Sequence, residues 1–300
     1  MTSPVILHHF EASPFSEKIR LIFGLKKIAW QSVLIPRIMP KPELMPLTGG
    51  YRRTPVLQIG ADVFCDTQVI ARELEARFPE PSLCPAGHAG MPWIVGMWTD
   101  RAFFNSTIPL VFGSLGDKVP QTKLRGAPFD VAAMTAALPH HRAQFRTNMD
   151  LLEAELSARP WLLGDTASLA DVNAYMNLWY VRTNLPDSGA LFEEFSRVRD
   201  WERRLKAAGH GARTDISGAD AIAIAHAAKP DTKVTPDPRD PSGHKPGDRV
   251  AVIADEPVRT TVEGEIVALS AQHIAIRRVD ARAGEVVVHF PRSGYVVERR

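Results

Sequence analysis

The sequence of 300 residues contains only two cysteines, Cys65 and Cys84, and they have neither CxxC spacing nor the spacing of a zinc site. Their scarcity excludes a disulfide-stabilised scaffold and is typical of a reducing compartment. The chain also lacks a run of about eighteen apolar residues, and its first residues lack a basic stretch followed by an apolar one. We therefore expect a cytoplasmic protein without a membrane span or a signal peptide.

An excess of charge of one sign is absent as well. The 36 lysine and arginine residues nearly balance the 34 acidic residues, and the formal net charge is +2. This balance favours neither nucleic acid nor a membrane surface as a partner. The adjacent pairs His8-His9 and His140-His141 lack metal-ligand spacing, because neighbouring residues on a strand point to opposite faces, so we expect no metal site.

The periodicity of the apolar residues divides the chain into four segments. Residues 1–80 predict strand, helix, strand, loop, hairpin and helix, which is a compact α/β unit. Residues 92–228 are predicted to be helical almost throughout. Residues 229–246 contain five prolines and almost nothing apolar, so they predict an extended linker. Residues 247–300 alternate with period two and predict five short strands, a small all-β domain of the SH3-like barrel class.

Short motifs stand at the ends of the predicted elements. They are Ser13-Pro14-Phe15 after the first strand, Thr54-Pro55-Val56-Leu57 at the start of the hairpin, Asp66-Thr67 at the start of the second helix, and Ser168 to Asp171, spaced as a capping box, in the helical segment. In this order and at these separations the motifs resemble those of the glutathione S-transferase family, over about residues 5–229. The serine motif resembles that of the serine-type, tau-like members.

The resemblance implies a fold and a set of site residues. The fold would be a thioredoxin-like glutathione-binding domain in residues 1–80 and a helical domain in residues 92–228. Glutathione would be the co-substrate, a hydrophobic electrophile would be the second substrate, no metal would be needed, and the protein would be a homodimer. The implied site residues are Ser13 as the catalytic group, Thr54 and cis-Pro55 along the cysteinyl part of glutathione, Asp66 and Thr67 at its γ-glutamyl end, and Arg53 at its glycyl carboxylate.

The chemistry expected of Ser13 is stabilisation of a thiolate. A free thiol has a pKa of about 8.5, and only its thiolate attacks well. Lowering that pKa by two units requires about 2.7 kcal/mol, which a charge-assisted hydrogen bond at a helix N-terminus can supply. Two alternatives stay open: Ser13 is only an N-cap followed by Pro14 at the first helical position, or Ser16 supplies the hydroxyl.

The remaining candidates also have structural alternatives. Asp66 is equally suited to cap a helix, and Arg52 and Arg53 are equally suited to a solvated surface. Cys65 precedes Asp66 and would support a redox enzyme if its thiol were accessible. The residues considered for the electrophile site are Trp98, Arg101, Phe103 and Phe104, with Phe10 and Phe15 opposite, although aromatic residues at helical spacing are usual in a core.

The C-terminal β segment lies outside the resemblance. Its eight arginines and eight acidic residues balance, which argues against nucleic acid. It is either a module that binds a protein partner or a barrel that packs on the rest of the chain. The sequence thus predicts an enzyme that activates the glutathione thiolate for attack on an electrophilic small molecule; the alternative is a non-catalytic scaffold of the same fold with an appended β binding module.

Overall fold

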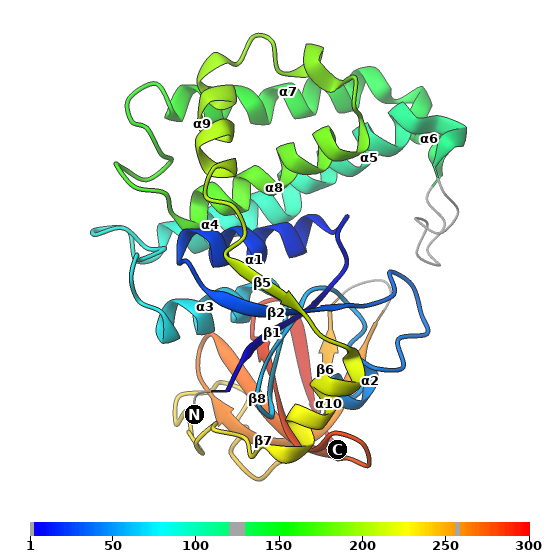
Figure 1. The fold of residues 1–300 in the computed structure, drawn as a ribbon, viewed down its shortest axis with the longest axis vertical. Helices are drawn as coiled ribbons and strands as arrows, with labels where there is room; N and C mark the ends of the chain where they lie inside the picture. Colours follow the sequence, from blue (N-terminus) through cyan, green and yellow to red (C-terminus); the bar gives the residue numbers. More distant parts are fainter. Residues whose placement is uncertain (1–2, 120–129, 256–258) are drawn as a thin grey trace. The chain divides into compact units, whose positions relative to one another are not determined.

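The protein is described by a computed structural model that covers residues 3–119, 130–255 and 259–300. Contacts divide the chain into two units, which are described separately (Figure 1). Unit 1 contains Met1–Glu11, Ala29–Leu74 and Ala212–Arg300, and unit 2 contains Ala12–Ile28 and Glu75–Gly211. Unit 1 holds the strands, and unit 2 is helical.

A single ten-stranded sheet runs through unit 1, in the order β10-β6-β7-β8-β9-β4-β3-β1-β2-β5. The strands are β1 (Val5–His9), β2 (Ala29–Leu34), β3 (Val56–Ile59), β4 (Asp62–Cys65), β5 (Ala212–Asp215), β6 (Arg249–Ala254), β7 (Thr261–Leu269), β8 (His273–Asp280), β9 (Gly284–Pro291) and β10 (Tyr295–Arg299). The helices of this unit are α2 (Met45–Thr48) and α10 (Gly218–Ala227), and α3 (Thr67–Arg77) begins in it.

The thioredoxin-like part of the sheet follows the predicted order. β1 pairs in parallel with β2 and antiparallel with β3, and β3 pairs with β4 as the predicted hairpin. Every residue of β1, β3 and β4 is buried, as expected of strands covered on both faces. The prediction of a thioredoxin-like α/β fold followed by a helical region and a β-rich end is therefore confirmed.

Burial of β1 places His8 in the core. Its Nε2 lies 2.9 Å from Gln58 Oε1, and Gln58 in turn donates to the Ala221 carbonyl at 2.8 Å. Burial lowers the pKa of His8 to about 4, more than the hydrogen bond to Gln58 raises it. The ring is therefore neutral at pH 7.

His8 should make the protein sensitive to mild acid. Because its folded pKa of about 4 lies below the ordinary 6.5, the unfolded chain takes up the proton first as the pH falls. The stability is complete above pH 6.5 and is lost between pH 6.5 and 4. Between pH 7 and 5, His8 alone should cost about 2 kcal/mol of unfolding free energy. Urea titrations at both pH values check this: His8→Asn should lose about 2 kcal/mol less than the wild type, and equal losses would contradict it.

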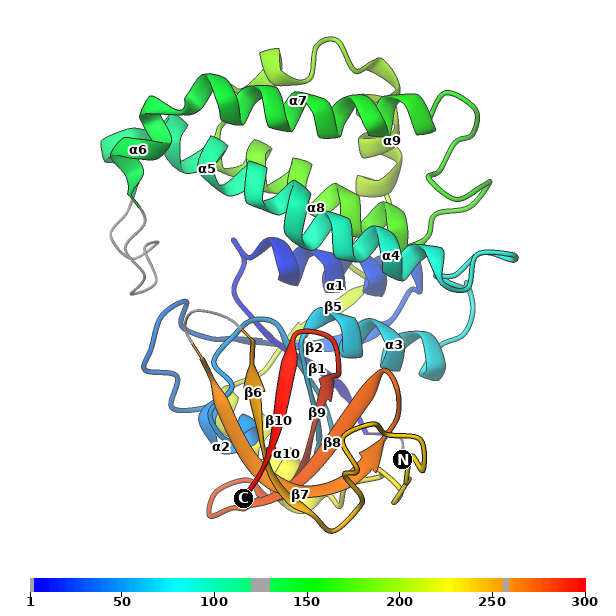
Figure 2. The same cartoon turned by 180° about the vertical axis from the view of Figure 1, so that it is seen from behind.

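The C-terminal strands continue the sheet of the thioredoxin-like part. β6 to β9 are antiparallel neighbours in sequence order, and β10 pairs back onto β6. Figure 2 shows these strands together. At the junction β9 pairs in parallel with β4, with Phe64 opposite His289. The five predicted strands are confirmed, and one hydrophobic core extends from Ile6 to Phe290 through both parts of the sheet.

A buried polar cluster holds β4 to β9. His289 Nε2 lies 3.0 Å from Asp62 Oδ1, its other ring nitrogen lies 2.9 Å from His273 Nε2, and the ring stacks on Phe64 at 4.1 Å. Thr232 also donates to Asp62. Contacts of the Asp62 carboxylate with His289 and Thr232 hold its pKa below the usual value against the effect of burial. The polar groups at this junction are thus mutually satisfied, as burial requires.

A second contact joins the C-terminal segment to the short helix α2. Arg278 donates from Nη1 to the Pro46 carbonyl at 2.5 Å. Gly49 ends α2 with φ 71°, and a Cβ on it would lie 2.4 Å from Arg278 Nε. Glycine is therefore required here both by the left-handed conformation and by the close approach of the guanidinium.

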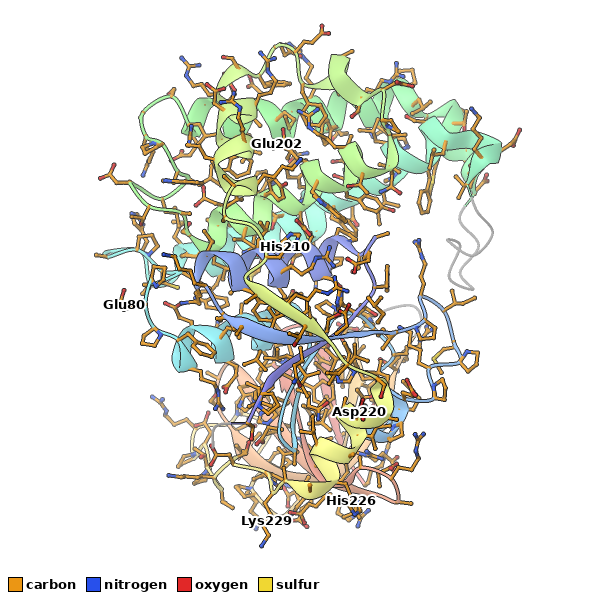
Figure 3. The ribbon with its side chains drawn as sticks, in the orientation of Figure 1. Glu80, Glu202, His210, Asp220, His226 and Lys229 are labelled. Carbon is orange, nitrogen blue, oxygen red and sulfur yellow. The ribbon has the colours of Figure 1, made fainter. Side chains whose placement is uncertain are left out.

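β5 differs from the expected helical segment, whereas the helix α10 that follows it agrees. β5 pairs in parallel with β2, Ala29 opposite Ala212, at the far edge of the sheet (Figure 1). All four of its residues are exposed, so they carry no alternating pattern from which a strand could be predicted. α10 follows, and Figure 3 labels its residues Asp220 and His226. Ser217 Oγ accepts from the Asp220 amide at 3.0 Å.

Unit 2 consists of helices. They are α1 (Pro14–Leu25), α4 (Met91–Trp98), the π-helix η1 (Thr99–Phe103), α5 (Phe104–Leu115), the 3-10 helix η2 (Gly116–Lys118), α6 (Val131–Ala136), α7 (Leu138–Glu155), α8 (Leu169–Asn184), the 3-10 helix η4 (Ser188–Leu191) and α9 (Ser196–Lys206). Pro139 is at the second position of α7, where a proline is tolerated. Within the described ranges, no helix is both long and apolar enough to span a bilayer.

The core of unit 2 is organised around Asp171, at the start of α8. Its Oδ2 accepts from the backbone amide and the hydroxyl of Ser168 at 2.9 and 2.7 Å. Its Oδ1 accepts from the Leu162 amide at 2.9 Å and from Trp201 Nε1 at 2.7 Å. The capping pair predicted from the sequence is present, and it also ties α8 to α9 and to the preceding loop.

Candidate functional site

In unit 1, the end of β1, the start of β3 and the end of β4 lie side by side. The register sets Val56, the first residue of β3, opposite both His8 near the end of β1 and Cys65 at the end of β4. Thr54-Pro55 directly precedes β3, and Asp66-Thr67 directly follows β4. These predicted site residues therefore lie at the same end of two neighbouring strands. β1 also ends here; Ser13, four positions further along the chain, belongs to unit 2.

The segment before β3 is held by a buried lysine. The Thr54–Pro55 peptide is cis, as predicted. Lys41 Nζ donates to the Arg52 carbonyl at 2.6 Å and to Thr54 Oγ1 at 3.2 Å, and the residue is only 3% exposed. Sequence reasoning missed Lys41; its position between Pro40 and Pro42 in the loop after β2 was the available signal. Arg53 is half-buried.

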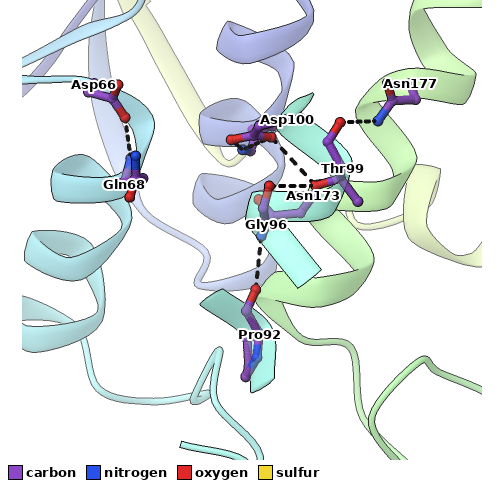
Figure 4. A network of polar contacts seen from close by, with 9 residues as sticks. Asp66, Gln68, Pro92, Gly96, Thr99, Asp100, Asn173 and Asn177 are labelled. Carbon is purple, nitrogen blue, oxygen red and sulfur yellow. Dashed lines mark hydrogen bonds and ion pairs between the residues drawn. The ribbon is translucent and has the colours of Figure 1, made fainter. Parts of the chain in front are cut away.

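Asp66 stands between β4 and α3 with a positive φ of 91°. Its Oδ1 accepts from the Gln68 amide at 2.9 Å, which is the capping contact that the sequence left open (Figure 4). Its Oδ2 accepts from the hydroxyl of Tyr295 at 3.2 Å. Thr67 begins α3 and is 6% exposed. A carboxylate and a hydroxyl thus stand at the first turn of a helix, where backbone amides favour anionic groups.

Cys65 does not support a redox function. It lies in β4, fully buried, and is not disulfide-bonded. Burial, and then the nearby Asp66 carboxylate, raise the pKa of its thiol well above the ordinary value. A buried thiol kept protonated neither attacks disulfides nor exchanges with them.

Ser13 is the N-cap of α1, and Pro14 is at the first helical position. Its Oγ accepts from the Ser16 amide at 3.2 Å, and the residue is 2% exposed. This contact uses a lone pair of the oxygen and not its proton, so the hydroxyl can still donate. The N-cap alternative is therefore realised, and it is compatible with thiolate stabilisation at a helix N-terminus.

Ser16, the second serine of this turn, is fully buried. Among the residues that the structure describes, its Oγ has no hydrogen-bond partner. Full burial, which also counts against Cys65, counts against Ser16 as the donor to a ligand sulfur, and a variant of each serine separates the two alternatives.

An ion pair joins a π-helical turn of unit 2 to α1. In η1 the Phe104 amide bonds to the Thr99 carbonyl, which also accepts from Asn177 Nδ2 at 3.2 Å (Figure 4). The next residue, Asp100, accepts from Lys18 Nζ at 2.8 and 2.9 Å. Such turns are frequent at functional sites, and this one fixes a carboxylate against the first helix.

The aromatic candidates for an electrophile site differ in burial and packing. Phe103 is fully buried and stacks with Trp98 at 5.5 Å, so of its two alternatives the structure shows the core one. Phe15 and Phe104 make an edge contact at 5.0 Å, and Phe104 also packs on Tyr180 at 6.0 Å. Phe15, Phe104 and Trp98 are half-buried, and Arg101 is exposed.

A charged groove of about 740 Å³ lies on the C-terminal strands. Its lining residues include Arg249, Arg277 and Arg278 with Glu263 and Glu265. No predicted site residue lines it. No group of three or more acidic, histidine or cysteine side chains in the described parts of the chain has the geometry to hold a metal ion.

The fold and the motifs together define the class of protein: a thioredoxin-like sheet with a cis-proline strand and an acidic helix start, followed by a helical region of the glutathione-transferase type. The sequence models of the glutathione S-transferase N-terminal and C-terminal domains match residues 7–82 and 135–204. The chain is 38% identical to a GST-like protein from Pseudomonas syringae whose crystal structure matches 99% of this chain and 100% of that one, with a TM-score of 0.85. The chain belongs to the glutathione S-transferase family.

Other relatives match about two thirds of the chain. FtsZ-localized protein A of Caulobacter vibrioides is 28% identical over 209 residues, which are 67% of this chain and 86% of that protein. A glutathione S-transferase from Methylobacterium radiotolerans, solved in complex with glutathione sulfonate, matches 71% of this chain and 98% of its own, at 19% identity and a TM-score of 0.52. The Pseudomonas match thus shows that the C-terminal segment is shared with at least one relative.

Proposed function

We propose that the protein binds glutathione where β1 and β4 end and β3 begins. We propose further that it activates the glutathione thiol for attack on an electrophilic small molecule. The observation that carries the proposal is the arrangement at these strand ends. A cis-proline precedes β3, and an aspartate and a buried threonine stand at the start of α3. Family membership supports glutathione as the ligand.

Each residue has a defined task in this proposal. Asp66 pairs with the γ-glutamyl ammonium, while Thr67 and the first amides of α3 take the γ-glutamyl carboxylate. The backbone of Thr54, before Pro55, pairs with the cysteinyl part as an added strand does. Arg53 holds the glycyl carboxylate. Ser13 donates its hydroxyl proton to the sulfur as a hydrogen bond and stabilises the thiolate, which is the nucleophile.

We also propose a cytoplasmic homodimer. Two cysteines without a disulfide suit a reducing compartment. Met91, Ile94 and Met97 expose apolar side chains at intervals of three residues along α4. Such a stripe on a helix is the kind of surface that a second copy covers.

A second candidate function is a scaffold that binds another protein. The name of the Caulobacter relative describes it by localisation to FtsZ, which supports protein binding as a role for this fold. The two functions differ in one measurement, because a scaffold without a ligand site does not bind glutathione at millimolar concentration.

Isothermal titration with glutathione tests the proposed site through Asp66→Asn. Asparagine tolerates the positive φ and keeps the cap to Gln68, but it removes the charge that faces the ammonium. The dissociation constant should rise about tenfold, as expected for the loss of a charge-assisted hydrogen bond.

The matched control is Asp130→Asn. Asp130 caps α6 by accepting from the Ala133 amide at 2.9 Å, so the same substitution is made at the same kind of helix start. It should leave the dissociation constant unchanged. Equal affinities of wild type and Asp66→Asn would remove Asp66 from the site, and a wild type that binds no glutathione would favour the scaffold.

A further inference from the structure

One residue of the C-terminal segment contacts Asp66, which directly follows β4. Tyr295 is the first residue of β10, which pairs with β6 by placing Tyr295 opposite Ala254. Its hydroxyl donates to Asp66 Oδ2 at 3.2 Å, across 229 positions of sequence and within unit 1. This contact is made by a part of the chain that the glutathione S-transferase domain models do not cover.

Tyr295 is itself held by a second tyrosine. A side-chain hydrogen bond joins Tyr51 and Tyr295. Burial, and then neighbouring charge, raise the pKa of both hydroxyls well above the ordinary value, so both remain donors.

Packing fixes the rings that carry these hydroxyls. Tyr51 is 2% exposed and makes an edge contact with Phe290 at 6.0 Å, and Phe290 packs on Tyr295 at 5.5 Å. Phe290 lies in β9, which joins the thioredoxin-like strands through β4. The direction of the Tyr295 hydroxyl is therefore set by the sheet and not by a mobile side chain.

Donors now hold both oxygens of the Asp66 carboxylate, Gln68 on Oδ1 and Tyr295 on Oδ2. Two donors on opposite oxygens fix the plane of the carboxylate, which a single donor does not. Orientation in advance of binding reduces the entropy that the ligand must otherwise supply.

We propose that Tyr295 is a positioning residue for Asp66, and that the C-terminal β segment thereby completes the γ-glutamyl part of the glutathione site. The inference rests on the proposed function and adds a role for the appended strands: through Tyr295 they hold the carboxylate that faces the γ-glutamyl ammonium. The opposite role, in which Tyr295 covers Asp66 and competes with the ligand, predicts the opposite change in affinity.

The experiment measures dissociation constants of the full chain for two ligands by isothermal titration. One ligand is glutathione, and the other is glutaryl-cysteinylglycine, which lacks only the γ-glutamyl amino group. Tyr295→Phe should weaken glutathione binding by about threefold to tenfold, as expected for one hydrogen bond, and leave binding of the analogue unchanged. Tyr51→Phe, which removes a hydroxyl one bond further from Asp66, is the matched control and should have a smaller effect. Thermal unfolding checks that both variants fold.

Each other outcome overturns the inference in a distinguishable way. Unchanged glutathione binding by Tyr295→Phe shows that Asp66 needs no second donor. Tighter binding shows that Tyr295 covers Asp66. Equal weakening for both ligands shows a structural role that does not act on the ammonium. A wild type that binds glutathione no better than the analogue removes the ammonium contact, and a wild type that binds neither ligand removes the proposed function together with this inference.

Discussion

Replacing Ser13 with alanine should lower kcat/KM for glutathione conjugation about 25-fold at pH 7, because the thiolate fraction falls from about three quarters at a pKa of about 6.5 to about 3% at the ordinary pKa of about 8.5. The reason is that alanine removes the hydroxyl that donates to the sulfur, while the helix N-terminus stays. The measurement is conjugation of glutathione to a chlorodinitrobenzene, followed as a function of pH. The rate of the variant should recover as the pH rises toward the ordinary thiol pKa of about 8.5, because bulk hydroxide then supplies the thiolate.

Ser16→Ala is the matched control for Ser13→Ala. It makes the same change in the same helical turn, at a buried hydroxyl that lacks a partner among the described residues. It should leave kcat/KM and its pH profile unchanged. If Ser16→Ala loses the activity and Ser13→Ala keeps it, the roles of the two serines are reversed. Alanine at an N-cap also costs about 1 kcal/mol of helix stability, which thermal unfolding separates from the catalytic effect.

Replacing Asp171 with alanine should destabilise the protein by about 4 kcal/mol. The carboxylate accepts four hydrogen bonds in the core of unit 2, from Leu162, from Trp201, and from the amide and hydroxyl of Ser168. Its removal leaves the buried Trp201 Nε1 and Leu162 amide without an acceptor, and each such group costs about 1–3 kcal/mol. Urea unfolding, followed by tryptophan fluorescence, measures the loss.

The control for Asp171 is Asp200→Ala, which removes a carboxylate from the neighbouring helix α9. Asp200 is paired with Arg203, and both side chains are more than half exposed. Exposed pairs contribute about 0–1 kcal/mol, so this variant should unfold almost as the wild type does. Similar stabilities of the Asp171 and Asp200 variants would show that the four contacts of Asp171 are replaced by others when it is removed.

The parts of the fold that the sequence predicted well are those in which a local pattern and the tertiary structure agree. Ser13-Pro14 marks the start of α1 because capping and a first-turn proline are local effects. The Ser168–Asp171 pair is likewise local, within four residues. The strands β1, β3 and β4 are buried on both faces, so their apolar character appears directly in the sequence.

The parts that the sequence did not predict depend on contacts between distant residues. β5 is exposed along its length and is a strand only because β2 offers it a free edge. The pairing of β9 with β4 has no local signal in the sequence. The apolar pattern of each strand is the same whether the strand lies at an edge of a sheet or inside it. For the same reason the contact of Tyr295 with Asp66 required the structure.

The candidate site shows the same division. The family resemblance implied the cis peptide before Pro55, and the residue types at Asp66-Thr67 predicted a helix start; the structure has both. Sequence reasoning missed Lys41, whose ammonium reaches Thr54 from the loop after β2. It also left open whether Phe103 lines a pocket or belongs to the core, and the structure packs this side chain against Trp98 and Phe145. Periodicity alone does not separate an aromatic residue of a core from one that lines a pocket.

The most direct test of the account is the ionisation of glutathione on the protein, followed by the ultraviolet absorbance of its thiolate across a pH titration. With Ser13 donating at the start of α1, the bound thiol should titrate about two units below the ordinary value of about 8.5, and the Ser13→Ala complex should titrate close to that value. A wild-type complex whose sulfur ionises at the ordinary pKa would contradict the central claim.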